Sequence, residues 1–267
     1  MRITRTILIG LLAALIGCAT SPLGRSQLML VGDAEMDQMG IEAFEQLKKD
    51  QKVSSDSGKN AYVVCVANAI TSALPPEHAG NWEVRVFEDE SANAFALPGK
   101  KIGVHTGLLA VAKNQDQLAT VLGHEVGHVV ARHNAERMSD TVATQVGAQA
   151  AGALLGAVSD PTSPLHGLAL GALGLTAQGV VLKFSRTHES EADKLGLDLM
   201  ARSGFDPRQS VPLWQNMDAA AKGARPPEFL STHPSPATRI KDLQARIPEN
   251  LPVAEKARAG GRNPRCK

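Results

Sequence analysis

The sequence feature that most constrains this chain is the motif His124-Glu125-Val126-Gly127-His128, which reads H-E-x-x-H. The run before it, residues 117–122, contains no Gly or Pro, and its apolar spacing predicts a helix. Because residues four apart share a helix face, both imidazoles can bind one Zn²⁺. Glu125 then lies where a general base would act on a water molecule. Such a motif can also arise by chance, so the assignment depends on the motifs that accompany it.

Length and composition leave the number of domains open, but they argue against a polyanionic partner and against a disulfide scaffold. A chain of 267 residues allows one large domain or two small ones. The formal net charge is +1, which gives no indication of a nucleic-acid or other polyanionic partner. The three cysteines, Cys18, Cys65 and Cys266, are too few for a disulfide scaffold, and the sequence has no C-x-x-C.

The N-terminus is typical of a bacterial secretion signal. Arg2 and Arg5 precede an apolar run over residues 7–16 that is too short to span a membrane as a helix. The run ends in Leu15-Ile16-Gly17-Cys18, which resembles the bacterial lipobox, where the peptide is cut before the cysteine and the cysteine is lipidated. A lipid on Cys18 would tether the mature chain to a membrane. The alternative is an ordinary signal peptide that happens to contain a cysteine.

The residue after the lipobox bears on the compartment. By analogy with known lipoproteins, Ala19 in place of Asp favours the outer membrane, so we expect the protein to face the periplasm. That compartment is oxidising, and Cys65 and Cys266 could then form a disulfide. Cys65 lies in the apolar run 61–66, however, and a buried cysteine is commonly just a small hydrophobic residue. Both interpretations stay open.

The apolar periodicity predicts a chain that is mostly helical with a small sheet. A strand is expected over residues 82–87, followed by a hairpin over 93–106 that turns at Pro98-Gly99. The expected helices cover residues 33–49, 61–74, 107–112, 117–132, 183–203, 207–221 and 237–246.

A further helical hairpin is expected over residues 141–182, which are rich in Gly and Ala. Each half approaches the length of a membrane span, but Gln149, His166 and Gln178 interrupt the apolar runs. We favour a buried or lid-like hairpin. The alternative is a surface that dips into lipid or pairs with another subunit.

A catalytic zinc usually has three protein ligands and one open position. The metzincin extension H-E-x-x-H-x-x-G-x-x-H is excluded, because its Gly and last His positions hold Ala131 and Asn134. His133 lies five residues past His128 and is turned off the ligand face of a helix. We therefore expect His133 to orient a ligand or to be structural.

A second motif supplies the third ligand. Glu189-Ser190-Glu191-Ala192-Asp193 reads E-x-x-A-D, and H-E-x-x-H followed by E-x-x-A-D resembles metallopeptidase family 48, in particular its branch of bacterial periplasmic lipoproteins. The resemblance covers roughly residues 61–246. It implies that Glu189 is the third zinc ligand and that Asp193 holds a ligand histidine in orientation. Glu191 competes with Glu189 on composition, but it lies about 200° away around a helix.

The segment Asn93-Ala94-Phe95-Ala96-Leu97-Pro98-Gly99 resembles the N-A-F-A-x-P-G segment of this family, a strand edge beside the active site. The resemblance implies that Asn93, Ala94, Phe95 and Ala96 bind substrate. An edge strand can hold an extended peptide through main-chain hydrogen bonds, largely independent of its sequence. The Lys100-Lys101 pair that follows departs from the family pattern and puts only the turn geometry in question.

A last element, Ser231-Thr232-His233-Pro234 with Arg239 downstream, resembles the S-T-H-P…R element of the family. It implies a catalytic role for His233, which could donate to the oxyanion or occupy the open zinc position and hold the enzyme off. A histidine that simply caps a turn is the structural alternative. Arg239 could pair with a carboxylate near the site or lie on the surface.

The resemblance implies an α+β, mostly helical, zincin-like fold of the gluzincin type, with a small β-sheet whose edge strand flanks the active site. We expect a signal peptide over 1–17, a lipidated cysteine and tether over 18–30, a zinc metallopeptidase domain over 31–247 and a loose C-terminal tail over 248–267.

The predicted function is a zinc-dependent metalloendopeptidase with one Zn²⁺ per chain, held by His124, His128 and Glu189, with Glu125 as general base. The expected substrates are polypeptides, in particular misfolded or unassembled envelope proteins, and the expected membrane contact is the lipid on Cys18. The alternative is a latched protease that acts mainly as a periplasmic chaperone or assembly factor. A zinc hydrolase of non-peptide bonds is a weaker prediction, because the edge strand suits a peptide. The oligomeric state stays open.

Overall fold

The computed structural model describes residues 18–146, 184–221, 229–233 and 238–267. The expected signal peptide and most of the Gly-rich hairpin lie outside these residues. The strands are β1 (Cys18–Thr20), β2 (Ser26–Leu28), β3 (Glu83–Phe87), β4 (Ala94–Leu97) and β5 (Lys101–His105). The helices are α2 (Asp33–Asp50), α3 (Ser57–Thr71), α4 (Leu108–Val111), α5 (Gln115–Val130), α6 (His133–Val146), α9 (Arg186–Arg202), the 3₁₀ turn η1 (Pro207–Gln209), α10 (Ser210–Ala221), α11 (Phe229–Thr232) and α12 (Arg239–Ala259).

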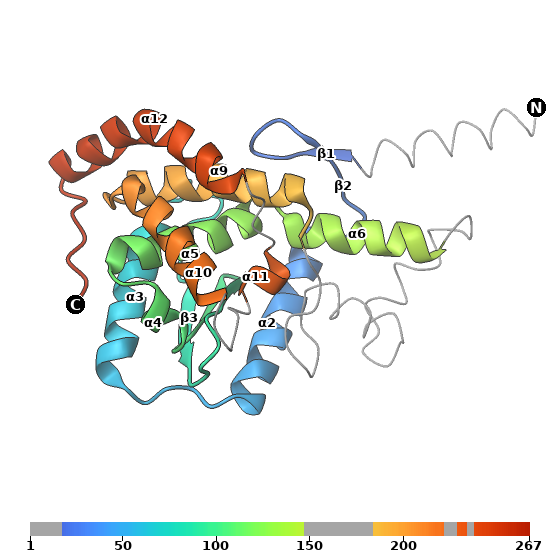
Figure 1. The fold of residues 1–267 in the computed structure, drawn as a ribbon. Helices are drawn as coiled ribbons and strands as arrows, with labels where there is room; N and C mark the ends of the chain where they lie inside the picture. Colours follow the sequence, from blue (N-terminus) through green and yellow to red (C-terminus); the bar gives the residue numbers. More distant parts are fainter. Residues whose placement is uncertain (1–17, 147–183, 222–228, 234–237) are drawn as a thin grey trace, which may run out of the picture.

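The main sheet is small and mixed. Its strand order is β3-β5-β4, with β3 parallel to β5 and β4 antiparallel to it, so β4 is an edge strand. Figure 1 shows the sheet below the helices α5, α9 and α12, with α2 and α3 on either side of it. The mostly helical α+β fold and the β4–β5 hairpin are confirmed.

The turn between β4 and β5 lies close against α2. Gly99 has a φ of 77°, which favours glycine, and a Cβ there would meet the Asp37 carbonyl oxygen at 2.7 Å. Its main-chain N–H donates to the Asp37 carboxylate at 2.7 Å. Lys100 follows with a φ of 61°, so the residue that departs from the family pattern sits in a left-handed turn position.

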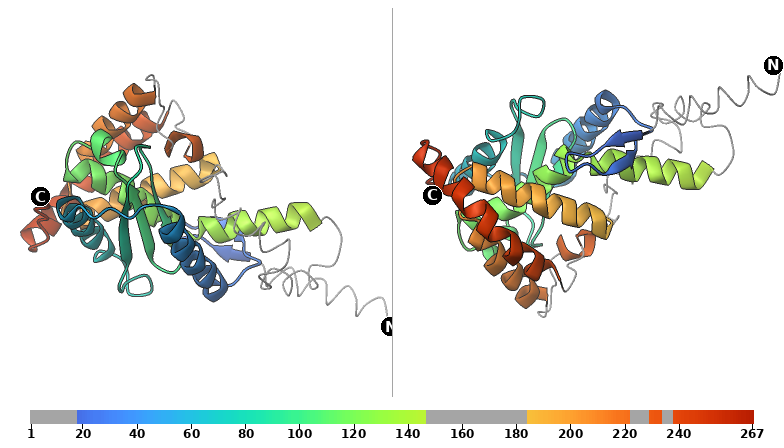
Figure 2. Two further views of the ribbon diagram at one scale, coloured as in Figure 1. Left: turned by 90° about the horizontal axis from the view of Figure 1, so that it is seen from below. Right: turned by 90° about the horizontal axis from the view of Figure 1, so that it is seen from above.

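Helix α5 is the centre of the core. The Asn114 side chain accepts a hydrogen bond from the Gln117 N–H and caps its N-terminus. Helix α9 crosses α5 closely enough that a Cβ at Gly123 would lie 2.8 Å from the Gly196 carbonyl oxygen. This small-residue contact brings the first turns of α9 beside the H-E-x-x-H turn. Viewed from above, α9 lies between α5 and α12 (Figure 2).

The C-terminal region differs from the expected loose tail. Helix α12 continues through Pro248 and Pro252 and ends only at Ala259, packed across α9. The chain then returns toward α3, where Cys266 forms a disulfide with Cys65 across a Cα–Cα distance of 5.6 Å (Figure 1). The prediction of a loose tail is therefore wrong. The apolar periodicity and the prolines of this segment indicate neither its packing on α9 nor the disulfide between Cys65 and Cys266.

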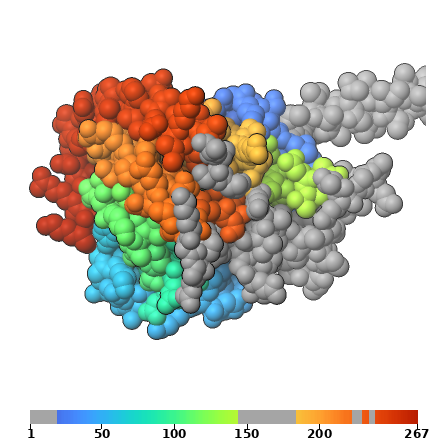
Figure 3. All heavy atoms as spheres, viewed as in Figure 1, coloured from blue at the N-terminus to red at the C-terminus, as the bar shows by residue number. Residues whose placement is uncertain are grey.

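The N-terminal residues also form more than a tether. Strands β1 and β2 pair as an antiparallel hairpin, and β2 packs against α6. Gln27 is 2% exposed and donates to the carbonyl oxygen of Ala131 at 2.7 Å. In the space-filling view the blue hairpin lies against the yellow-green α6 and the yellow start of α9 (Figure 3). The expected plain tether over residues 18–30 is thus replaced by a docked hairpin.

Within the described ranges, no helix is both long enough and apolar enough to cross a membrane.

Candidate active site

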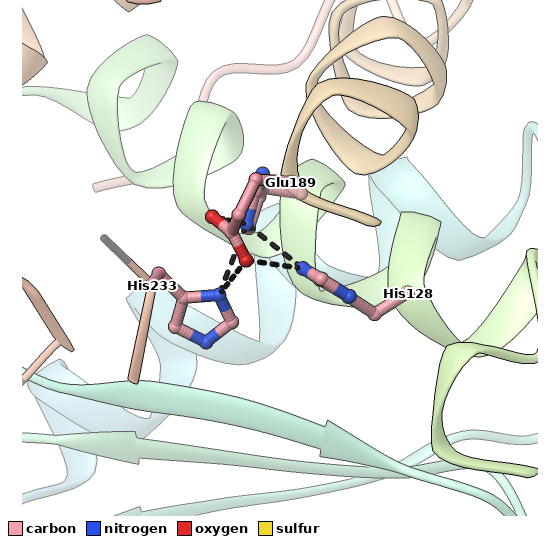
Figure 4. Close-up of side chains that lie close together, drawn as sticks. His128, Glu189 and His233 are labelled. Atoms are coloured by element: carbon pink, nitrogen blue, oxygen red, sulfur yellow. Dashed lines mark hydrogen bonds and ion pairs between the residues drawn. The ribbon is translucent and has the colours of Figure 1, made fainter. Parts of the chain in front are cut away.

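Four buried side chains place donor atoms within 4.8 Å of one another: His124, His128, Glu189 and His233. His124 and His128 come from α5, Glu189 from the first turn of α9, and His233 follows α11 directly. Figure 4 shows His128, Glu189 and His233 pointing toward one another above the sheet. The structure therefore brings together residues that the sequence separates by up to 109 positions.

The spacing of the donor atoms fits a tetrahedral metal. Nε2 of His124 lies 3.0 Å from Nε2 of His128 and 3.2 Å from Nδ1 of His233. Oε1 of Glu189 lies 3.4 Å from Nε2 of His128 and 3.0 Å from Nδ1 of His233. Donors about 2.1 Å from a tetrahedral Zn²⁺ lie about 3.4 Å apart, and imidazole and carboxylate are ligands that zinc prefers. The cluster thus suits one zinc ion.

Asp193 and Arg239 contact the donor cluster and hold two of its side chains in position. Oδ1 of Asp193 lies 2.9 Å from Nδ1 of His124, which leaves Nε2 of that ring to face the cluster. Arg239 donates from Nη1 to Glu189 at 3.2 Å and from Nη2 to Asp193 at 2.5 Å. Arg239 is only 1% exposed, and its guanidinium stacks 3.6 Å above the ring of Trp214. The alternative of a surface position for Arg239 is therefore wrong.

The electrostatics of the cluster attract a cation. Burial opposes the ionisation of Glu189, but His233, His124 and His128 hold its pKa far below its usual value. Burial also lowers the pKa of His124, but the hydrogen bonds to Asp193 and Glu189 outweigh this effect and raise it to about 9. Burial lowers the pKa of His128 well below its ordinary value. The ionised carboxylate of Glu189 therefore faces imidazole nitrogens for which a metal ion can compete with protons.

Glu125 lies between the cluster and strand β4. It is 3% exposed, and burial raises its pKa. The nearby main-chain N–H of Ala96 opposes this rise in pKa, and Oε1 of Glu125 lies 3.5 Å from Nε2 of His233. Within the described part of the chain, this Oε1 has no hydrogen-bond partner. A buried acceptor without a partner is costly, which is typical of a functional group.

Strand β4 turns the main-chain groups of alternate residues toward the edge that pairs with no strand among the described residues. The Asn93 carbonyl oxygen accepts a hydrogen bond from the His105 N–H at 3.0 Å, so the ladder to β5 uses Asn93, Phe95 and Leu97. The main-chain groups of Ala94 and Ala96 consequently face away from β5, toward Glu125. The Phe95 ring packs over Gly103 in a cluster with Phe44.

His233 is held by aromatic neighbours as well as by the cluster. Its ring stacks on Phe229, with centroids 4.4 Å apart, and on Phe184, at 5.1 Å. The Phe229 N–H donates to the Ala92 carbonyl oxygen at 3.3 Å, which docks α11 beside the start of β4. This segment therefore supplies the fourth donor and lies against the residues just before β4.

A second buried layer lies behind His128, in which the sequence predicted a supporting role for His133 but missed the contribution of Glu191. Nδ1 of His133 lies 2.9 Å from Nδ1 of His128, and Nε2 of His133 lies 3.2 Å from Oε2 of Glu191. Burial and the neighbouring His188 lower the pKa of His133 to about 4, so that ring is neutral. Glu191 thus supports the site without entering the metal cluster. The 3.6-residue period placed Glu191 away from Glu189 but could not show what lay there.

The comparisons with known proteins agree with this geometry. The sequence model described as Peptidase family M48 matches residues 57–247. The mitochondrial metalloendopeptidase OMA1 of Schizosaccharomyces pombe is 41% identical over 177 residues, which is 63% of this chain and 47% of that protein. The beta-barrel assembly-enhancing protease of Escherichia coli K12 is 33% identical over 226 residues, 81% of this chain and 44% of that protein. The mitochondrial OMA1 of Bos taurus is 33% identical over 251 residues, 87% of this chain and 46% of that protein.

This chain spans about half the length of the curated relatives that it matches. The match to the family covers most of the chain, including the H-E-x-x-H helix, the E-x-x-A-D helix and strand β4. The chain belongs to peptidase family M48, whose metallopeptidases depend on zinc.

Proposed function

We propose that this protein is a zinc-dependent metalloendopeptidase in which His124, His128 and Glu189 hold the metal. The observation that carries the proposal is Glu125. Its carboxylate is buried, has a raised pKa, and lies between the donor cluster and the main-chain edge of β4 that pairs with no strand among the described residues. A base in that position can serve hydrolysis of a peptide laid along the strand.

Zinc, when bound, supplies a Lewis acid and lowers the pKa of water to about 7. Glu125 takes a proton from the attacking water at Oε1 and delivers it to the amine that leaves. Burial raises the pKa of Glu125 above its usual value, which makes the carboxylate a stronger base for the first of these transfers. Asp193 and Arg239 fix the orientation of His124 and Glu189 during these steps.

Substrate binding falls to the main chain of Ala94 and Ala96. These groups can extend the sheet with an incoming peptide, and hydrogen bonds of this kind are indifferent to side chains. Asn93 stands at the start of the strand, where its side chain is 2% exposed and could contact the peptide once the edge opens. Phe95 bonds to β5 and packs in the core, which leaves it no main-chain group on that edge.

His233 acts as a latch in this proposal. Its Nδ1 fills the fourth donor position, 3.0 Å from Glu189 and 3.2 Å from His124, where water would otherwise bind. The α11 segment beside it also blocks the start of β4. Movement of this segment would free the fourth metal position and the start of β4 at the same time. In that open form, His233 could serve as the oxyanion donor that the sequence suggests.

The setting that we propose is the periplasmic face of a bacterial envelope, with the chain anchored by lipid on Cys18. The lipobox supports this, and the relative named for beta-barrel assembly suggests misfolded or unassembled envelope proteins as substrates. The OMA1 relatives carry mitochondrial names, so the compartment needs its own test. Labelling of the wild type but not Cys18→Ser by a radioactive fatty acid in growing cells would support the anchor; equal labelling would contradict it.

The activity is tested on purified full-length protein by metal content and casein cleavage. Glu125→Gln should keep zinc and lose cleavage, whereas Glu189→Ala should lose zinc. An active Glu125→Gln variant would overturn the mechanism. If Glu189→Ala keeps stoichiometric zinc, the ligand assignment fails.

The buried latch favours one second candidate, a closed protease that works mainly as a chaperone or assembly factor. Rescue of a deletion phenotype by Glu125→Gln would support that function. Failure of the same variant to rescue, at normal expression level, would support proteolysis.

A further inference from the structure

The N-terminal hairpin inserts one arginine between two buried carboxylates. Arg25 donates from Nη1 and Nη2 to the two carboxylate oxygens of Glu136, at 2.5 and 2.6 Å. Its Nε donates to Oε2 of Glu191 at 3.0 Å. Glu136 and Glu191 are 7% and 4% exposed and lie on different helices, α6 and α9. A planar guanidinium is the cation that suits two such carboxylates at once.

Each of these carboxylates also holds a histidine. Oε2 of Glu191 lies 3.2 Å from Nε2 of His133, and Oε2 of Glu136 lies 3.1 Å from Nε2 of His188. The two imidazoles stack with their centroids 4.4 Å apart and their planes 23° from parallel. Arg25 is therefore the common partner of two carboxylate–imidazole pairs, of which the pair of Glu191 and His133 reaches the metal cluster at His128.

The row that runs from Arg25 through Glu191 and His133 to His128 has one consistent assignment of protons. A metal on Nε2 of His128 requires the proton of that ring on Nδ1, which can donate to Nδ1 of His133 across 2.9 Å. His133 then carries its own proton on Nε2 and donates it to Glu191. Glu191 accepts from both His133 and Arg25, so every donor in the row faces an acceptor.

We propose that Arg25 is a positioning residue for the metal ligand His128, acting through Glu191 and His133, so that the N-terminal hairpin is part of the active site. The inference rests on the ligand assignment proposed above. Histidine ligands of zinc are commonly oriented by a carboxylate on their second nitrogen. Here the imidazole of His133 takes the place of that carboxylate. The partner of His133 is Glu191, which is held by Arg25 of the hairpin, 166 residues away in the chain.

The alternative is that Arg25 only fastens the hairpin to the body of the protein. Gln27 already does so, with donations of 2.7 Å to Ala131 and to Glu136. A fastening role predicts lower thermal stability for Arg25→Ala but an unchanged rate of zinc release. A positioning role predicts faster release from every variant that breaks the row.

The test measures zinc release from the zinc-loaded full-length protein to a chromophoric chelator, next to thermal unfolding. Arg25→Ala should release zinc faster than the wild type, by at most the factor of about 10 to 100 that follows loss of a group in direct contact with a ligand, which is here His133. Arg25→Lys keeps the charge but cannot bridge both carboxylates, so its rate should be intermediate. The matched control is Arg202→Ala, which removes an arginine paired with Asp198 on the same helix α9 and should leave the rate unchanged.

A double-mutant cycle decides the route. In a His133→Phe background the row is already broken, so adding Arg25→Ala should change the release rate less than about twofold. If the two effects multiply, Arg25 acts by another route and the proposal is wrong. An unchanged rate in Arg25→Ala also overturns it, and if that variant does not fold, Arg25→Lys carries the same comparison.

The same experiment separates this inference from the proposed function. If Glu189→Ala loses zinc while Arg25→Ala releases it at the wild-type rate, the ligand assignment stands and the role of Arg25 fails. If Glu189→Ala keeps its zinc, the ligand assignment itself fails.

Discussion

Nδ1 of His124 and Oδ1 of Asp193 lie 2.9 Å apart, although 69 residues separate them in the chain. Arg239 donates from Nη2 to the same oxygen at 2.5 Å and so holds the carboxylate in place beside the imidazole. The contact places the His124 proton on Nδ1 and leaves Nε2 for a metal. The Asp193 carboxylate on α9 thus determines which nitrogen of His124 on α5 is available to a metal.

Replacing that carboxylate should weaken zinc binding. Asp193→Asn keeps the size of the side chain but offers an amide that can present its NH₂ to the imidazole, so zinc affinity should fall about 10- to 100-fold. Competition with a chelator of known affinity measures the change. Asp198→Asn, a surface position on the same helix, is the control. Wild-type affinity in Asp193→Asn would show that Asp193 does not orient the ligand.

Removing the latch should raise activity. His233→Ala leaves His124, His128 and Glu189 as ligands and opens the fourth position to water, so kcat/KM for a fluorogenic peptide should increase. If the open form is a tenth of the wild-type population, the increase is about 10-fold. The double variant Glu125→Gln/His233→Ala should be inactive. A fall in kcat at unchanged KM would instead identify His233 as an oxyanion donor.

The close crossing of α5 and α9 should tolerate no side chain at Gly123. A Cβ there would meet the Gly196 carbonyl oxygen at 2.8 Å, and neither backbone can yield alone. Gly123→Ala should cost about 1–3 kcal/mol of unfolding free energy and lower the zinc content, because α9 carries Glu189. Urea unfolding and metal analysis measure both effects.

Gly58→Ala is the matched control for this change. A Cβ at Gly58 lies 3.4 Å from Oδ1 of Asp56, which is an ordinary van der Waals contact. That variant should keep wild-type stability and zinc. Wild-type behaviour of Gly123→Ala itself would contradict the requirement for a small residue at the crossing.

Glu83 should give the fold a measurable pH dependence. Burial raises the pKa of its carboxyl group, but Lys101 and Lys48, at 2.8 and 3.0 Å, outweigh this effect and lower it to about 2. Because the folded-state pKa lies below the unfolded one, the stabilisation is present above about pH 4.5 and disappears as the pH falls toward 2. Urea unfolding of the wild type and Glu83→Gln should therefore differ at pH 6 and converge near pH 2. A constant difference would contradict the assignment.

The sequence predicted the parts of this molecule that are encoded locally. The H-E-x-x-H helix, the E-x-x-A-D helix and the β4–β5 hairpin all follow from the apolar period and the turn residues within a few positions. The family resemblance added which of these side chains should meet. The structure then placed His124, His128 and Glu189 in one buried cluster.

What the sequence could not predict depends on contacts between distant segments. No sequence pattern near Arg25 indicates that this residue bridges Glu136 and Glu191, which lie more than a hundred positions away. Pro248 and Pro252 argue locally against a helix, yet α12 passes through both because its face is packed on α9. Compartment alone left the pairing of Cys65 and Cys266 open, until the fold brought them together.

The disulfide has a consequence for a protein of a protease family. Cys65 and Cys266 are 201 residues apart and enclose nearly all of the segment that matches the family. A single cut in any peptide bond between them, by another copy or by a different enzyme, would leave two fragments that stay covalently joined. A nicked molecule would then migrate as an intact chain on a non-reducing gel and separate only after reduction, so a clipped form could retain its assembled core.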